Sequence, residues 1–422
     1  MSLAKELARS GIDVSDDLVR RRAASADFAW LSPVLQRRLP GEPADVVAWP
    51  RDGDELAACV AVAHRHEVPV TPRGRGTGNY GQAVPLRRGL VIDCTRMRRV
   101  LAVDDGWARV EPGVTCAALE GAARRSGQEL ALFPSTTQST IGGFLAGGAG
   151  GSGSIDHGLL WEGFVASVDV LACVDAPGVE HVSGSATRPF LHAYGTTGVL
   201  AGARIRLDRA REWTGVIASF EDFGAGAAVG NRLLDASVPL RLLGVSEADL
   251  VANFPPRPFL PPDRASLRCV TPTGTVSAVI DMLAGGGGRV EGEGPRLVPV
   301  VTSLSYNHVT LRAKQADPAI CHLQVSGPVL SDDPDAVRRC LPDGRLHLDA
   351  MRAGGVVGFG GLLISRFEAE PLLREGVIAL TELGVHVVDP HTWSVWDGDG
   401  SVARTARRMD PDGLLNPGKL ER

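Results

Sequence analysis

A chain of 422 residues exceeds what one ordinary hydrophobic core holds, so we expect two domains or one large domain with an insertion. Hydrophobic residues make up 44% of the sequence, and the formal net charge is −5. The chain has no basic block and no stripe of Lys and Arg interleaved with aromatic residues, which excludes the common nucleic-acid-binding classes.

The seven cysteines are scattered and form no C-x-x-C pair. This usage is typical of reduced thiols in a cytoplasmic protein and argues against disulfide or zinc frameworks. The N-terminal stretch is charged and amphipathic and lacks the apolar core of a signal peptide, and no run reaches the length of a membrane span. We therefore expect a cytoplasmic protein with no membrane partner.

The first half of the chain alternates short helices and strands. A helical segment is expected at residues 1–33, and the apolar spacing of Asp52–Glu67 predicts a helix. The elements that follow are a strand at 68–74, a strand at 89–95, a hairpin at 100–115 that turns at Asp105-Gly106, a helix at 116–127 and a strand at 130–136. This alternation favours an α+β fold over an all-parallel sheet.

A second pattern begins at Glu212, where β-like stretches alternate with a helix candidate at 223–238 and a Pro-rich break at 253–263. It indicates a second α+β domain, with an antiparallel sheet. The expected organisation is an N-terminal helical segment at 1–33, a first domain at 34–209, a second domain at 210–385, and a stretch at 386–422 that returns to the first domain.

Thr71–Leu86, TPRGRGTGNYGQAVPL, follows the predicted strand and is rich in glycine. Such a turn lets an anion approach the backbone N–H groups, because no side chains stand in the way. A Rossmann nicotinamide site would need a helix directly after the glycines. Pro85 and further glycines prevent that helix here.

Two further small-residue segments occur in the first domain, at Ser135–Gly158 and His192–Leu207. Three such segments suggest an elongated ligand with a diphosphate in its middle. The alternative is that they are flexible loops, but linkers do not usually carry apolar residues such as Ile141, Phe144 and Leu145 in phase with glycine pairs.

The motifs TPRGRGTGNYGQAVP, PGVT, FPSTTQSTIGGFLAGGAGGSGS, HAYGTTGVL and DPDGLLNPGKL occur in this order. In order and spacing they resemble the PCMH-type FAD-binding domain of the vanillyl-alcohol oxidase and p-cresol methylhydroxylase superfamily. The FAD-linked oxidase branch, which includes D-lactate dehydrogenases and the FAD-linked subunit of glycolate oxidase, is the most similar. The resemblance covers roughly residues 40 to 208 and the last dozen residues.

This resemblance implies a two-subdomain FAD cradle and an α+β cap domain over the isoalloxazine ring. The first loop would wrap the diphosphate with backbone amides, the second cluster would line its other side, and the C-terminal tail would return to the flavin. The cofactor-binding residues that it implies are Pro72, Arg73, Gly74, Arg75, Gly76, Thr77, Gly78, Asn79, Tyr80, Gln82, Pro134, Ser135, Thr136, Thr140, Ile141, Gly142, Gly143, Gly147, Gly150, Gly151, Ser152, Gly153, Ile155, Gly198, Val199, Asn416 and Lys419.

The first loop departs from relatives that tether their flavin through histidine. Where those relatives carry the histidine, this chain has Thr77, and neither glycine cluster contains a cysteine. We therefore expect non-covalent FAD.

Polar residues in the second half of the chain are the candidates for catalysis. Tyr306, Asn307 and His308 lie together at an expected strand end, and Asp389 and His391 bracket Pro390. Segments similar to YNHVTL and DPHTW occur in a subgroup of FAD-linked oxidoreductases, where they look like segments that face the flavin. His391 and His308 are the expected base and orienter, in either order, because imidazole titrates near neutral pH.

Each candidate also has a purely structural interpretation. A single histidine is more often a hydrogen-bonded structural residue than a base, and this applies to His347 as well. Asp389 would orient His391 or would merely end a strand before Pro390. Arg366 would grip a substrate carboxylate in two places or would lie on the surface.

Metal catalysis is not expected. D-lactate and D-2-hydroxyglutarate dehydrogenase relatives carry a His-x6-His pattern and a later Glu-His pair, whereas this chain offers only His347 and no Glu-His dipeptide. That departure also argues against a simple 2-hydroxy-acid substrate.

The function that follows is an FAD-dependent oxidoreductase that takes a hydride from a C–H bond next to oxygen or nitrogen of a small molecule. O2 or another electron acceptor would reoxidise the flavin, and the composition is compatible with a homodimer. One alternative is a redox-neutral flavoenzyme, since one branch of the superfamily uses FAD in ether-lipid synthesis without net oxidation. Another is a binding protein that keeps FAD as a structural relic.

Overall fold

The computed structural model describes residues 2–421. Its first sheet contains both parallel and antiparallel strands. Met1 and Arg422, the ends of the first and last expected segments, lie outside the described residues. The strands follow the order β1 (Asp13–Ser15), β2 (Val46–Trp49), β4 (Leu90–Asp93) and β3 (Val70–Arg73). Strands β2, β4 and β3 are parallel, whereas β1 is antiparallel to β2. The segment expected to be helical at 1–33 therefore also supplies a strand, in addition to α1 (Leu3–Arg9) and α2 (Leu18–Ala24).

Helix α4 (Gly53–Arg65) covers this sheet together with α1. It begins where predicted because the Asp52 carboxylate accepts a hydrogen bond from Glu55 N at 2.9 Å, which satisfies a free amide of the first turn. Its buried residues recur at helical spacing and join α1 and the strands in one apolar cluster. The predicted helix at residues 52–67 is confirmed.

The second sheet is antiparallel and completes the first domain. Its strands are β5 (Val100–Asp104), β6 (Trp107–Val110), β10 (Val199–Arg209), β8 (Val165–Leu171) and β9 (Val179–Ser183), in this order, and β7 (Gln128–Leu130) also pairs with β10. The hairpin predicted at Asp105-Gly106 is confirmed as the β5–β6 turn. The helices of this part are α3 (Pro33–Arg38), α5 (Cys116–Arg124), α6 (Ile141–Gly147) and α7 (Ser154–His157).

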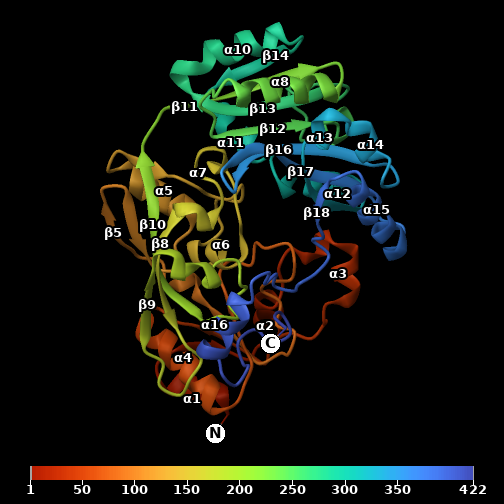
Figure 1. Ribbon diagram of the computed structural model, residues 1–422. Helices are drawn as coiled ribbons and strands as arrows, with labels where there is room; N and C mark the ends of the chain where they lie inside the picture. Colours follow the sequence, from red (N-terminus) through yellow and green to blue (C-terminus); the bar gives the residue numbers. More distant parts are fainter. Residues whose placement is uncertain (1, 422) are drawn as a thin grey trace.

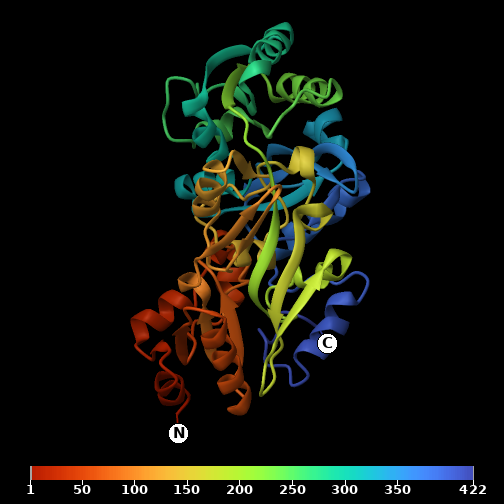
Figure 2. The ribbon, with the colours of Figure 1, turned by 90° about the vertical axis from the view of Figure 1, so that its left-hand side faces the viewer.

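The third sheet forms the cap and is antiparallel, as predicted. Its strand order is β14 (Arg289–Gly294), β11 (Trp213–Phe220), β13 (Ala265–Pro272), β12 (Leu242–Ser246), β16 (Arg345–Ala353), β17 (Val356–Arg366), β15 (Ile320–Ser326) and β18 (His386–Val388). Figures 1 and 2 show this sheet at one end of an elongated molecule, with the first domain at the other.

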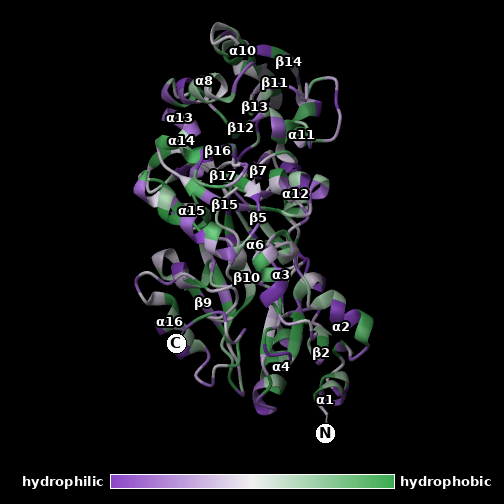
Figure 3. Ribbon diagram, turned by 90° about the vertical axis from the view of Figure 1, so that its right-hand side faces the viewer, coloured by the Kyte–Doolittle hydropathy of each residue, from purple (hydrophilic) through white to green (hydrophobic). Residues whose placement is uncertain are grey.

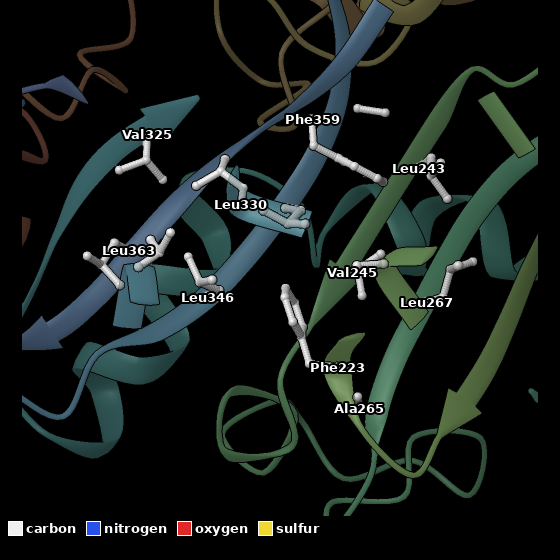
Figure 4. Packing of buried hydrophobic residues seen from close by; sticks show 14 of the residues in the cluster. Phe223, Leu243, Val245, Ala265, Leu267, Val325, Leu330, Leu346, Phe359 and Leu363 are labelled. Atoms are coloured by element: carbon white, nitrogen blue, oxygen red, sulfur yellow. The ribbon is translucent and has the colours of Figure 1, made fainter. Parts of the chain in front are cut away.

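Helices cover both faces of the cap sheet. One face packs against α8 (Phe223–Asp235), α10 (Val276–Gly285), α13 (Val329–Asp332), α14 (Pro334–Arg338) and α15 (Glu370–Glu382). The other packs against α9 (Ala248–Val251), α11 (Val298–Thr302) and α12 (Asn307–Ala316). Figure 4 shows part of the first core, with Phe223, Val245 and Phe359. In Figure 3 α4 and α15 carry both hydrophobic and hydrophilic bands, as expected of helices that lie on a sheet.

The chain passes into the cap between β10 and β11, so the predicted boundary at 209/210 coincides with this link. The return to the first domain begins after β18, three residues later than the predicted boundary at 385/386, because β18 pairs with β15. Helix α16 (Ser401–Met409) and the tail then lie against the first domain, where Leu415 pairs in parallel with Val70 of β3.

Candidate cofactor and active site

The first glycine loop leaves β3 with a row of free amides. The backbone N–H groups of residues 74–79 form no hydrogen bond within the described chain. Gly76 has a φ of 64°, a left-handed conformation that glycine adopts without strain. Consecutive free N–H groups beside side-chain-free positions suit an anionic group such as a diphosphate.

The second glycine cluster packs against this loop. A Cβ on Gly74 would lie 1.9 Å from Thr140 Oγ1, so the two segments approach as closely as they do only because residue 74 is glycine. The Thr77 and Ser139 hydroxyls are hydrogen-bonded at 2.7 Å. Gln82 joins the same segments, because its Oε1 accepts from Tyr80 N and its Nε2 donates to the Gly147 carbonyl.

Protein packing explains some of the glycines without a ligand. A Cβ at Gly151 would lie 2.1 Å from the Phe133 carbonyl oxygen, and a Cβ at Gly198 would lie 2.4 Å from Val170. Gly147 differs, since the nearest atom to its Cβ would be Gln82 Cγ at 3.8 Å. Protein packing would therefore accept a Cβ at this position, which would touch Gln82 at ordinary van der Waals distance.

Several predicted cofactor residues point their side chains elsewhere. The Arg73 guanidinium donates to the Ala24 and Ala26 carbonyls at the C-terminal end of α2. Ile141 and Ile155 are buried in hydrophobic cores, and Val199 packs in the core of the first sheet. These side chains do not face the loops, so only their backbones are available to a cofactor.

The C-terminal tail returns to the first loop, as the resemblance implies. Asn416 Nδ2 donates to the carbonyls of Gln82 and Tyr194, and the fully buried Lys419 Nζ donates to the Gly81 carbonyl. Burial lowers the pKa of Lys419 to about 7, although the Asp27 carboxylate opposes this shift. Both side chains thus hold the loop in place.

Three consecutive cap residues bridge to the first domain, one to the first glycine loop and two to the segment Ser135–Gly158. Tyr306 Oη donates to the Gly151 carbonyl at 2.7 Å, and Asn307 Nδ2 donates to Tyr80 Oη at 2.9 Å. His308 Nε2 is hydrogen-bonded to Thr136 Oγ1 at 2.9 Å. The prediction that these residues end a strand is wrong, because α12 begins at Asn307 and Tyr306 is its N-cap.

His308 has both ring nitrogens occupied. Its Nδ1 lies 3.1 Å from the Ser303 carbonyl, which only accepts, so Nδ1 carries the hydrogen. Burial lowers the pKa of His308, which favours the neutral ring. Nε2 then accepts from the Thr136 hydroxyl, and this geometry suits an orienting residue better than a free base.

His391 has one ring nitrogen without a partner. Its Nδ1 is hydrogen-bonded to Ser32 Oγ at 2.7 Å, whereas the buried Nε2 has no partner among residues 2–421. Asp389 does not orient the ring, because its carboxylate accepts from His391 N. Burial lowers the pKa of His391 below its usual range, so the ring is neutral at pH 7.

His322 and Gln324 on β15 also reach this junction, although the sequence did not single them out. Gln324 Nε2 donates to Tyr80 Oη at 2.6 Å, which makes it a second cap donor to the first loop. His322 is buried with both ring nitrogens unpartnered in the described chain, and burial, with a smaller contribution from His391, lowers its pKa to about 3. The signal available was their alternation with apolar residues in ICHLQVS, which places 320, 322, 324 and 326 on one face of a strand.

Two other predicted cap residues lie apart from this junction. Arg366 is exposed at the end of β17 and forms an ion pair with Asp317 at 3.2 Å, so the surface interpretation holds. His347 is fully buried in the cap, where it contacts Ser246 and Asp349. Asp349 in turn accepts from Tyr306 N at 2.8 Å, so His347 supports the start of α12 and does not face the loops.

Metal-binding and membrane-spanning features are both missing from the described chain. Within residues 2–421, no three His, Cys, Asp or Glu side chains are grouped so that they could hold a metal ion. No helix in the same range is long and apolar enough to cross a bilayer.

Comparison with known proteins identifies the cofactor of the first domain. A family profile described as an FAD binding domain matches residues 44–176. This part of the chain therefore carries an FAD-binding domain. Its cofactor is FAD, and the free amides of residues 74–79 fit that cofactor.

The similarity to curated proteins covers about half of this chain. The chain is 28% identical over 213 residues to a probable mitochondrial D-lactate dehydrogenase of Danio rerio, which covers 47% of this chain and 42% of that protein. It is 30% identical over 209 residues to the glycolate oxidase subunit GlcD of Escherichia coli K12, which covers 46% of this chain and 41% of that protein. The alignments therefore span less than half of these relatives.

The fold extends the similarity to the cap. A solved alkyldihydroxyacetonephosphate synthase superposes with a TM-score of 0.78 over 99% of this chain and 86% of that chain, at 16% sequence identity. At this identity the likeness concerns the architecture, an FAD-binding domain with an antiparallel cap sheet.

Proposed function

We propose that the protein is an FAD-dependent oxidoreductase that removes a hydride from a C–H bond next to oxygen or nitrogen of a small molecule. The observation that carries the proposal is the unpartnered Nε2 of His391, a buried basic atom at the junction of the cap with the FAD-binding domain. The oxidoreductase names of the relatives support the same reaction class.

When bound, FAD supplies a two-electron acceptor for the hydride at its N5 atom. The chain's own residues supply proton transfer and positioning. Ser32 Oγ accepts from Leu35 N–H at 3.0 Å and lies 2.7 Å from His391 Nδ1, and we take the tautomer in which Nδ1–H donates to its second lone pair. In that tautomer Nε2 holds the free electron pair, so His391 accepts the proton of the substrate hydroxyl or amine.

His308 acts as an orienting residue. Its ring links α12 to Thr136, so it fixes the cap relative to the segment that follows β7. We further propose that FAD is bound non-covalently, that O2 or another electron acceptor takes its electrons, and that the protein works in the cytoplasm.

Anaerobic mixing of the FAD-loaded protein with hydroxy acids, alcohols and amines tests the proposal. An oxidoreductase ends its half-reaction with reduced FAD, so at least one donor is expected to bleach the flavin absorbance. Product formation without bleaching would instead favour the redox-neutral alternative. Flavin that is never bleached, in the presence of any donor, would contradict the proposed reaction.

A further inference from the structure

We propose that the Tyr80 hydroxyl donates a hydrogen bond to the reacting oxygen of the substrate, and that it thereby selects hydroxyl donors over amines. The inference rests on the proposed function and names a residue and a substrate class for it. It is carried by the hydrogen bonds at Tyr80 Oη and by the position of that atom at the junction.

Both lone pairs of the Tyr80 hydroxyl are occupied. A phenol oxygen accepts two hydrogen bonds and donates one. Asn307 Nδ2 at 2.9 Å and Gln324 Nε2 at 2.6 Å supply the two that it accepts. The hydroxyl hydrogen has no acceptor in residues 2–421, and because the side chain is only half-buried this donor is free for a ligand. Burial raises the pKa of Tyr80 to about 12, so this hydrogen is present at any physiological pH.

The same junction holds the proposed base. Gln324 pairs with Val388 across β15 and β18, and His391 follows three residues after Val388. On the other side, a Cβ at Gly81 would lie 3.6 Å from Trp393 Cβ, two residues after His391. The segment that carries His391 is thus held between Gln324 and Gly81, both of which adjoin Tyr80.

An alcohol oxygen matches this pair of groups. Its hydrogen is donated to His391 Nε2, and its lone pair accepts from Tyr80 Oη. In the oxidation, the C–H hydrogen would leave with the bonding electron pair, which bound FAD would accept, the O–H proton would pass to Nε2, and a C=O bond would form. The carbonyl oxygen keeps the hydrogen bond from Tyr80, which stabilises the charge that develops on it.

An amine in its prevalent protonated form does not match the pair formed by His391 Nε2 and Tyr80 Oη. At neutral pH an alkylamine is an ammonium ion, which has hydrogen atoms to donate and no lone pair for the Tyr80 hydrogen. The nearest carboxylate on the His391 segment, Asp389, is exposed and already accepts from His391 N. Amine donors are therefore disfavoured here.

Fluorine NMR tests the inference directly, because the chain has only three tyrosines. Fluorotyrosine is incorporated into the FAD-loaded protein, and the Tyr80 resonance is assigned by its loss in Tyr80→Phe. Oxalate, which offers oxygen acceptors and no hydride, is expected to shift this resonance, whereas ethylenediamine is not. The Tyr194 and Tyr306 signals serve as internal controls. The inference would be overturned if oxalate left the Tyr80 resonance unshifted, or if ethylenediamine shifted it as much as oxalate does.

The rate of flavin reduction gives a second readout. It is measured with matched pairs of a hydroxy donor and an amino donor, lactate with alanine and glycolate with glycine. Loss of one donor that stabilises developing charge typically costs about 100-fold in rate, so at saturating FAD Tyr80→Phe is expected to slow reduction by the hydroxy donor by about this factor. An unchanged rate would contradict the inference. If no donor bleaches the wild-type flavin, the proposed function fails, and the Tyr80 resonance still decides the inference independently.

Discussion

Tyr306 of the cap donates its hydroxyl hydrogen to the carbonyl of Gly151 in the second glycine cluster, at 2.7 Å. Its φ of 54° is unusual for a residue with a side chain, and Asp349 holds it there by accepting from its backbone N–H. A strained cap residue thus contacts the second glycine cluster, which we expect to line the cofactor. Docking of the cap and ordering of that segment are consequently coupled.

Removal of this hydroxyl tests the coupling. Tyr306→Phe keeps the ring and leaves the Gly151 carbonyl without its donor, so we expect the free energy of unfolding to fall by about 1 kcal/mol. FAD affinity should fall as well, because the second cluster loses its cap support. Urea unfolding and FAD titration measure the two effects. Unchanged FAD affinity in a destabilised variant would show that the cap and the cofactor segment are independent.

A substitution at Gly147 tests whether the cofactor approaches this position. Its Cβ would have no protein atom closer than 3.8 Å, so Gly147→Ala should fold normally and weaken FAD binding at least about tenfold if the added methyl meets the cofactor. Gly121→Ala in α5 is the control for a Cβ added to a helix, because no atom lies within 4 Å of its Cβ. Equal FAD affinity in the two variants would place the cofactor elsewhere.

The buried His322 makes the free energy of unfolding depend on pH in the acid range. Burial lowers its pKa to about 3, whereas an unfolded histidine titrates near 6.5. Between these values the unfolded chain binds a proton that the folded chain does not, so stability falls as pH drops from 6.5. His322→Leu should flatten this dependence in urea unfolding between pH 7 and about pH 5. An identical slope in the variant would contradict the assignment.

Non-covalent binding of FAD predicts that acid releases it. Thr77 stands where tethered relatives carry histidine, and its hydroxyl is hydrogen-bonded to Ser139. Acid precipitation of the purified protein should leave all flavin absorbance in the supernatant. A yellow pellet would mean a covalent link.

The cofactor half of the site could be predicted because its signals are local. Glycine segments and the terminal NPGKL motif appear as short ordered stretches, and the pairing of Leu415 with Val70 brings the tail back as expected. The catalytic half depends on contacts between distant residues. The partner of His391 is Ser32, 359 positions away, and no local pattern indicates it.

Tyr306 shows the same limit for secondary structure. The segment YNHVTL contains β-branched and aromatic residues and favours a strand by propensity. Asp349 nevertheless fixes Tyr306 in a left-handed conformation from which α12 starts, so a tertiary contact overrides the local preference. Gln324 and His322 were missed because they lie within an otherwise apolar strand that looks like ordinary core.

The most direct test of the account is anaerobic reduction of FAD in His391 variants. His391→Asn retains a polar atom for Ser32 but lacks Nε2, and His391→Ala removes both. We expect both variants to bind FAD with wild-type stoichiometry. With the best donor, each should reduce FAD at least about 100-fold more slowly than wild type does, since a general base contributes at least this factor. Reduction at the wild-type rate in either variant would contradict the assignment of His391 as the base.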